Sequence, residues 1–166
     1  LYKMCFEVEK SKLITDFHGL QSPKYLPGLT PFPHQLEAAE TIIERMNGKA
    51  ILADEVGLGK TIQAGLILKE YLIRGLVKKA LILVPASLMN QWIDELNQKF
   101  HIPVIHYKKA YDLDYCNIVI ASIDMAKRSP HKENLYNQDF DLIIIDEAHK
   151  LKNPKTKNYE FVQNLK

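Results

Sequence analysis

The sequence has 166 residues, which is enough for one compact domain and too few for a second domain of full size. Hydrophobic residues make up 46% of it and charged residues 25%, a balance that excludes a disordered or fibrous chain. With 22 Lys and Arg residues against 20 Asp and Glu residues, the chain has no overall basic field, so any nucleic-acid surface requires local clustering.

The predicted elements alternate along the chain between short strands and longer helices. This alternation is typical of βαβ units, so we predict an α/β fold in which a parallel sheet is flanked by helices. Residues 1–28 show no clear period, and we predict that they form an irregular or appended segment before a domain of residues 29–166. The predicted strands, in chain order, are residues 49–53, 80–84, 104–107, 117–121 and 141–146.

Helical periodicity characterises several segments between these strands. One helix is predicted to begin near Pro33, and another to cover residues 61–75 and end at Gly75. A third contains apolar residues at helical spacing, and we predict that these belong to the core rather than contact a ligand: Leu88, the lone Trp92, Leu96 and Phe100.

The segment 53–61, ADEVGLGKT, lies between a predicted strand and a predicted helix, which is the setting of a phosphate-binding loop. Its glycines let backbone N–H groups turn towards phosphate oxygens, Lys60 can reach the outer phosphates, and Thr61 can ligate magnesium. Asp54 departs from the usual pattern, which has glycine there, but the loop's core is intact. A tight turn with an exposed lysine is the alternative. The residues predicted to bind the nucleotide are Gly57, Leu58, Gly59, Lys60 and Thr61.

A second candidate segment is DLIIIDEAHKLKN, in which an apolar strand delivers Asp146 and Glu147 to its carboxyl end. Open α/β sheets bind ligands at that end of their strands. Asp146 can hold magnesium, usually through water, and Glu147 can orient and deprotonate the water that attacks a γ-phosphate. His149 could equally be a surface histidine. The basic segment 149–157 is the clearest local cluster of charge, although a solvated turn is the simpler interpretation.

These segments resemble the helicase superfamily 2 ATPases, and within them the Swi/Snf-type branch of DNA translocases and remodellers. The combination of GLGKTIQ with DEAHKLKN is specific to that branch, and the phosphate loop is similar to that of bacterial members associated with RNA polymerase. The resemblance covers about residues 30–153 and rests on FPHQLEAA (32–39), LADEVGLGKTIQAGLIL (52–68), LILVPASLMNQWIDEL (81–96), VIASIDMAKR (119–128) and DEAHKLKN (146–153).

The resemblance implies a RecA-like lobe that uses ATP and Mg²⁺, with Lys60 and Glu147 as catalytic residues. It implies that Gln35 reads the adenine edge and that His149 couples the nucleotide state to the DNA side; a polar residue at a helix start is the alternative for Gln35. It also implies sequence-independent contacts to the DNA backbone, for which helix capping is the alternative at Ser87. The candidate DNA contacts are Ser87, Ser122, Lys127 and Arg128.

On this resemblance we expect the ATP-binding lobe of an enzyme that moves along duplex DNA and remodels protein–DNA complexes. RNA polymerase or another DNA-bound complex is the expected partner, no membrane is involved, and the expected location is the cytoplasm or nucleoid. The alternatives are a lobe of a DEAH-type RNA or DNA helicase and a non-hydrolysing, ATP-responsive scaffold. The intact carboxylate pair and phosphate loop disfavour the scaffold.

The resemblance also predicts that this chain lacks parts of the complete enzyme. Because the first residue is Leu1 rather than Met, we expect a piece of a longer protein. The family's second RecA-like lobe, which supplies arginines to the nucleotide, does not follow the DEAH segment, so the chain alone is expected to be nearly inactive. The family's next strand is also missing, so we expect the sheet position between strands 49–53 and 141–146 to be empty or substituted.

Overall fold

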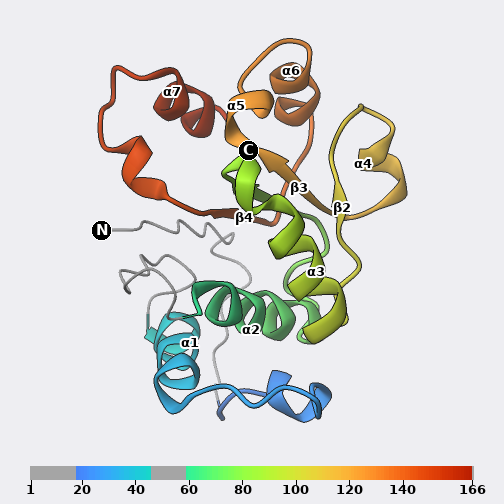
Figure 1. Ribbon diagram of the computed structural model, residues 1–166, viewed down its shortest axis with the longest axis vertical. Helices are drawn as coiled ribbons and strands as arrows, with labels where there is room; N and C mark the ends of the chain where they lie inside the picture. Colours follow the sequence, from blue (N-terminus) through green and yellow to red (C-terminus); the bar gives the residue numbers. More distant parts are fainter. Residues whose placement is uncertain (1–17, 46–58, 166) are drawn as a thin grey trace.

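The computed structural model describes residues 18–45 and 59–165 of the chain, and this part has the predicted α/β fold (Figure 1). Its α-helices are α1 (Pro33–Arg45), α2 (Lys60–Ile73), α3 (Met89–Lys99), α4 (Asp112–Tyr115), α5 (Ile123–Ala126), α6 (His131–Tyr136) and α7 (Lys157–Gln163). Its strands are β1 (Ala80–Val84), β2 (Ile105–His106), β3 (Ile118–Ser122) and β4 (Leu142–Ile145). Short 3₁₀ turns are η2 (Ser22–Tyr25), η3 (Ala86–Leu88) and η4 (Ala148–Leu151).

The four described strands form one parallel sheet in the order β2-β3-β1-β4. Leu81 of β1 lies opposite Val119 of β3 on one side and Ile143 of β4 on the other. All residues of β1 and β3 are buried, because both faces of the sheet are covered, and this explains their apolar runs without alternation. The predicted strand 49–53 lies outside the described residues, so the expected gap beside β4 stays a prediction.

Among the four described strands, no limit differs from the predicted one by more than one residue. β1 has the predicted bounds, β3 is shifted by one residue, and β2 and β4 are shorter than predicted. At β4 the reason is Asp141, whose Oδ2 accepts hydrogen bonds from the backbone N–H groups of Lys78 (2.8 Å) and Lys79 (3.0 Å). The side chain of Asp141 thus closes a turn between two chain segments instead of continuing the strand.

Two hydrophobic clusters lie on opposite faces of the sheet. The first joins β1, β3 and β4 to α1, α2 and α3, and it contains the predicted core residues Trp92, Leu96 and Phe100. Leu88, predicted for the same core, is only partly buried and packs against this cluster. The second joins the other face of the sheet to α5, α6 and α7, with Leu135 and Phe161 among its members. Because helices cover both faces of the sheet, a ligand can reach the sheet only at the ends of its strands.

Helix α2 is the most deeply buried helix of the first layer. Most of its residues are buried. It ends at Ile73, two residues before the predicted end, and Gly75 follows it in the left-handed region at φ 69°. A Cβ atom at Gly65 would lie 2.4 Å from the Phe100 ring, so only glycine allows α2 and the end of α3 to approach so closely.

The described part of the N-terminal segment packs on α2. Leu26 is buried in the first cluster, and the carboxylate of Glu70 accepts hydrogen bonds from the backbone N–H groups of Gln21 (2.9 and 3.0 Å) and Ser22 (2.7 Å). Arg74 donates to the same carboxylate at 2.7 Å and to the carbonyl oxygen of Gly19 at 3.1 Å. The domain boundary after residue 28 stays a prediction.

Candidate active site

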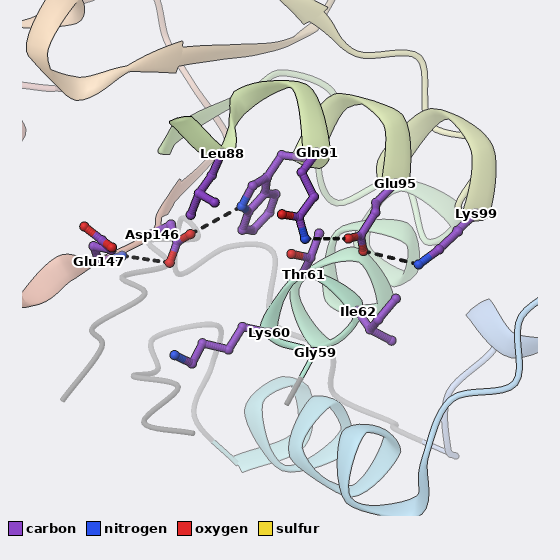
Figure 2. A pocket seen from close by; sticks show the side chains of 11 residues that line it. Gly59, Lys60, Thr61, Ile62, Leu88, Gln91, Glu95, Lys99, Asp146 and Glu147 are labelled. Atoms are coloured by element: carbon purple, nitrogen blue, oxygen red, sulfur yellow. Dashed lines mark hydrogen bonds and ion pairs between the residues drawn. The ribbon is translucent and has the colours of Figure 1, made fainter. Parts of the chain in front are cut away.

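A cavity of about 390 Å³ opens between the start of α2, helix α3 and the carboxyl end of β4 (Figure 2). It brings together five predicted site residues from two segments more than 80 positions apart: Gly59, Lys60 and Thr61 from the first, and Asp146 and Glu147 from the second. Gly57 and Leu58 lie outside the described residues. The lining residues are Gly59, Lys60, Thr61 and Ile62 from the start of α2, Leu88, Gln91, Trp92, Glu95 and Lys99 from α3 and its start, and Asp146 and Glu147 after β4.

The start of α2 combines a left-handed glycine with a helix N-terminus that no side chain caps. Gly59 adopts the left-handed conformation (φ 80°, ψ 41°), which costs glycine little, and α2 begins at the next residue with no side-chain cap. The first N–H groups of a helix have no partner within the helix, and together with the helix dipole they favour an anion. Lys60 and Thr61 stand in this first turn, so their predicted roles are compatible with the local structure.

Gln35 lies directly against this turn, although it belongs to α1. A Cβ atom at Gly59 would come within 2.3 Å of Nε2 of Gln35, so the glycine leaves the room that the amide occupies. Gln35 is only 3% exposed, and its Oε1 accepts a hydrogen bond from the backbone N–H of Phe32 at 2.9 Å. The residue therefore stabilises the start of α1, as the simpler interpretation held, and its contact with adenine stays a prediction.

Asp146 continues the ladder of β4 and then turns its carboxylate towards the cavity (Figure 2). Its backbone N–H donates to the carbonyl oxygen of Leu83 at 2.8 Å. Its Oδ1 accepts from the backbone N–H of Glu147 at 2.8 Å, and its Oδ2 accepts from Nε1 of Trp92 at 3.3 Å. Trp92 is the core residue that the spacing predicted, but the same pattern gave no sign that its indole N–H reaches the site.

Glu147 has a left-handed backbone (φ 56°, ψ 41°), which is uncommon for a residue other than glycine. Such conformations cost roughly 1 kcal/mol or more and gather at functional sites. The turn sends the chain from β4 into η4, and Glu147 is among the residues that line the cavity.

Lys150 forms an ion pair with Glu147 that the sequence analysis did not predict. Its Nζ lies 2.7 Å from Oε2 of Glu147, and this hydrogen bond raises the pKa of the Lys150 ammonium group, so the lysine stays charged at neutral pH. The i,i+3 spacing within the motif was the available signal. His149, beside Lys150, is partly buried in η4, and its coupling role stays a prediction.

The candidate DNA contacts follow the carboxyl ends of β1 and β3, but they differ in their surroundings. Ser87 is exposed in η3, and α3 begins after Leu88 without a side-chain cap, so the capping interpretation of Ser87 is wrong. Ser122 is the serine that caps: it is 9% exposed, and its Oγ accepts from the backbone N–H of Met125 at 3.3 Å at the start of α5. Arg128 is exposed.

Lys127 is tied to two side chains of the protein. Its Nζ lies 2.7 Å from Oδ1 of Asp124 and 2.9 Å from Oδ1 of Asn158, so it links α5 to α7. A contact between Lys127 and a DNA phosphate would have to compete with these bonds.

The residues present fit Mg²⁺ bound together with a nucleotide. Magnesium in such sites is held by one or two carboxylates, substrate phosphates and water rather than by a full set of protein ligands. Asp146 and Thr61 line the same cavity, which is the sparse donor set this requires. In residues 18–45 and 59–165 no group of three or more His, Cys, Asp and Glu side chains could hold a metal ion by itself.

The pattern of the SNF2-related domain family matches residues 34–166. The chain therefore belongs to the SNF2-related domain family. The Swi/Snf-type resemblance predicted from the motifs is confirmed, and this parallel sheet flanked by helices is the fold of that family's ATPase lobe.

Known proteins similar to this SNF2-related domain are longer than it. It is 64% identical to the "Uncharacterized ATP-dependent helicase YqhH" of Bacillus subtilis (strain 168) over 99% of this chain and 30% of that protein. It is 36% identical to the "RNA polymerase-associated protein RapA" of Actinobacillus pleuropneumoniae serotype 3 (strain JL03), over 80% of this chain and 16% of that protein. The chain thus spans less than a third of either relative.

A solved structure agrees with the fold. The "Sulfolobus solfataricus SWI2/SNF2 ATPase core in complex with dsDNA" superposes with a TM-score of 0.73 and 27% sequence identity, covering 83% of this chain and 30% of that one. In the part of our chain that the structure describes, no helix is both long and apolar enough to cross a membrane.

Proposed function

We propose that the chain is the first RecA-like lobe of a DNA-stimulated ATPase that moves along duplex DNA and remodels protein–DNA complexes. The observation that carries the proposal is the single cavity lined by Lys60 and Thr61 on one side and by Asp146 and Glu147 on the other. A phosphate cradle facing two carboxylates is the arrangement that ATP hydrolysis requires.

Within this site each residue has a separate task. Lys60 and the first N–H groups of α2 bind the phosphates, and Asp146 with Thr61 holds the metal. When bound, Mg²⁺ offsets the negative charge of the β- and γ-phosphates. Glu147 orients the attacking water and takes its proton, and Lys150, whose Nζ lies 2.7 Å from Oε2, restrains the carboxylate.

The DNA side of the proposal rests on the two exposed candidates, Ser87 and Arg128, and on the similar Sulfolobus solfataricus ATPase core, whose structure is a complex with dsDNA. Both residues follow strands of a parallel sheet, so they lie at the same end of the sheet as Asp146. Side chains of this kind bind DNA phosphates and make no contact with the bases, so we propose that the protein binds DNA without sequence preference. We propose that His149 couples the nucleotide site to the DNA-binding side of the lobe.

RNA polymerase is a proposed partner, because the RapA relative is named for its association with that enzyme. We also propose that turnover needs a second RecA-like lobe that closes over the nucleotide and supplies arginines. A location in the cytoplasm or nucleoid belongs to the same proposal.

The test is a phosphate-release assay on the complete protein in which this sequence occurs, with duplex DNA, single-stranded DNA and RNA compared at matched salt. Matched salt is necessary because backbone binding depends steeply on ionic strength. We expect the strongest stimulation by duplex DNA. Stimulation by RNA alone would favour a DEAH-type RNA helicase, and ATP binding without turnover under any condition would favour an ATP-responsive scaffold.

A further inference from the structure

Trp92 belongs both to the core and to the cavity wall. It is 2% exposed and packs in the same cluster as Leu96 and Phe100, so α3 holds its ring firmly. At the same time it lines the cavity, and its Nε1 donates to Oδ2 of Asp146 at 3.3 Å, the bond drawn from Asp146 in Figure 2. A buried indole N–H requires an acceptor, so ring and carboxylate fix each other.

Both oxygens of the Asp146 carboxylate are therefore held by the protein. Oδ1 accepts from the backbone N–H of Glu147 at 2.8 Å, and Oδ2 accepts from Trp92. The first bond joins neighbouring residues, so it orients the carboxylate only relative to its own strand. The second bond spans 54 positions and joins the end of β4 to helix α3. Each carboxylate oxygen has two acceptor positions, so one position per oxygen is left for a metal or its water.

We propose that Trp92 is a positioning residue for the metal site: its indole N–H holds the Asp146 carboxylate towards Thr61 and thereby strengthens Mg²⁺ binding in the Mg–ATP complex. The inference rests on the proposed Mg–ATP site. Outer groups that orient a metal ligand typically contribute tenfold or more to metal affinity. Trp92 itself touches neither metal nor nucleotide in this role, so metal-free ATP should bind equally well without the N–H.

The test uses the fact that Trp92 is the only tryptophan of this sequence. Biosynthetic replacement of tryptophan by β-(3-benzothienyl)alanine changes this position alone, keeps the two-ring shape and removes the N–H donor. 7-Azatryptophan keeps the donor and serves as the conservative replacement. Asp94→Ala, at an exposed position of the same helix, is the control variant.

Calorimetric titrations measure ATP binding in EDTA and the Mg²⁺ dependence of ATP binding, and thermal melts followed by circular dichroism monitor folding. We expect the benzothienyl protein and Trp92→Phe to require roughly tenfold more Mg²⁺, with metal-free ATP affinity unchanged. The 7-azatryptophan protein and Asp94→Ala should match the unmodified chain. In an Asp146→Ala background the benzothienyl replacement should have no further effect.

The outcomes separate this inference from the function on which it rests. An unmodified chain that binds no ATP, or binds it without dependence on Mg²⁺, contradicts the proposed function. A normal Mg²⁺ dependence that the benzothienyl replacement leaves unchanged overturns the role of Trp92 alone. An equal loss of affinity for metal-free ATP and Mg–ATP also overturns it, because the ring would then support the whole cavity rather than Asp146.

Discussion

At the scale of single residues, the site depends on groups whose surroundings are unusual for their type. Glu147 carries a left-handed backbone, and Gly59 leaves the space in which the Gln35 amide sits. Both Glu147 and Gly59 line the cavity. Strain and close approach of this kind are retained where a site requires a particular geometry.

Lys60 and Glu147 should fail in different ways when replaced. Lys60→Ala removes the charge that we propose to bind the phosphates, so we expect ATP affinity to fall at least roughly tenfold. Glu147→Gln keeps the shape and removes the proton acceptor, so we expect ATP binding to persist and hydrolysis to stop. Calorimetry and phosphate release by the complete protein check the two effects. An equal loss of affinity in both variants would contradict the assignment.

Tyr71, buried in α2, should make the fold sensitive to alkaline pH. Burial raises the pKa of its phenol to about 12, from an ordinary value of 10.0. Below pH 10 the phenol is neutral in both the folded and unfolded states, whereas between pH 10 and 12 only the unfolded state ionises. The free energy of unfolding should therefore fall as the pH rises through this window.

Urea unfolding at pH 8, 10 and 11 measures this loss. Tyr71→Phe removes the ionisable group and keeps the ring, so its unfolding free energy should fall less steeply over the same range. Parallel losses in both proteins would assign the alkaline sensitivity to other groups.

At the scale of elements, two serines at the carboxyl ends of the neighbouring strands β1 and β3 have different roles. Ser122 caps α5, so Ser122→Ala should lower the free energy of unfolding by about 1 kcal/mol. Ser87 is exposed and caps nothing, so Ser87→Ala should stay within about 0.5 kcal/mol of the original protein. Urea denaturation of the matched pair checks this. Equal destabilisation would mean that the capping assignment is wrong.

Glu70 joins α2 to the N-terminal segment. Its carboxylate is fully buried and accepts from the backbone of Gln21 and Ser22 and from Arg74. Glu70→Ala leaves those donors and the guanidinium without an acceptor, so we expect a loss of about 3 kcal/mol in the free energy of unfolding. Chemical denaturation measures it, with Glu37→Ala on the exposed face of α1 as the control. A cost similar to that of the control would show that residues 18–26 contribute little to stability.

At the scale of the whole molecule, only two cationic side chains, Lys60 and Lys99, are among the described residues that line the cavity. We expect the chain alone to bind Mg–ATP and to hydrolyse it very slowly. An arginine supplied by another element contributes roughly 10³ to 10⁵ in turnover, which the residues of this cavity cannot replace. Phosphate release with and without duplex DNA, beside the complete protein, measures the difference. Turnover by the chain near the rate of the complete protein would place the catalytic machinery within this lobe.

The sequence by itself determined the fold class and both halves of the candidate site. Apolar runs and helical periods depend on residues a few positions apart, so they identified β1, α1 and α3, and strand ends next to GLGKT and DEAH identified where a ligand would bind. Parallel strands then guarantee that residues at their carboxyl ends meet at one edge of the sheet.

Only the tertiary structure decided which distant side chains support that site. The bond from Trp92 to Asp146 joins residues 54 positions apart, and the bonds of Glu70 to the N-terminal segment span 48 and 49 positions. A periodic pattern shows that Trp92 faces the core, but not which polar group its N–H meets there. That partner depends on how α3 and β4 pack across the layers, and no local pattern in the chain records that packing.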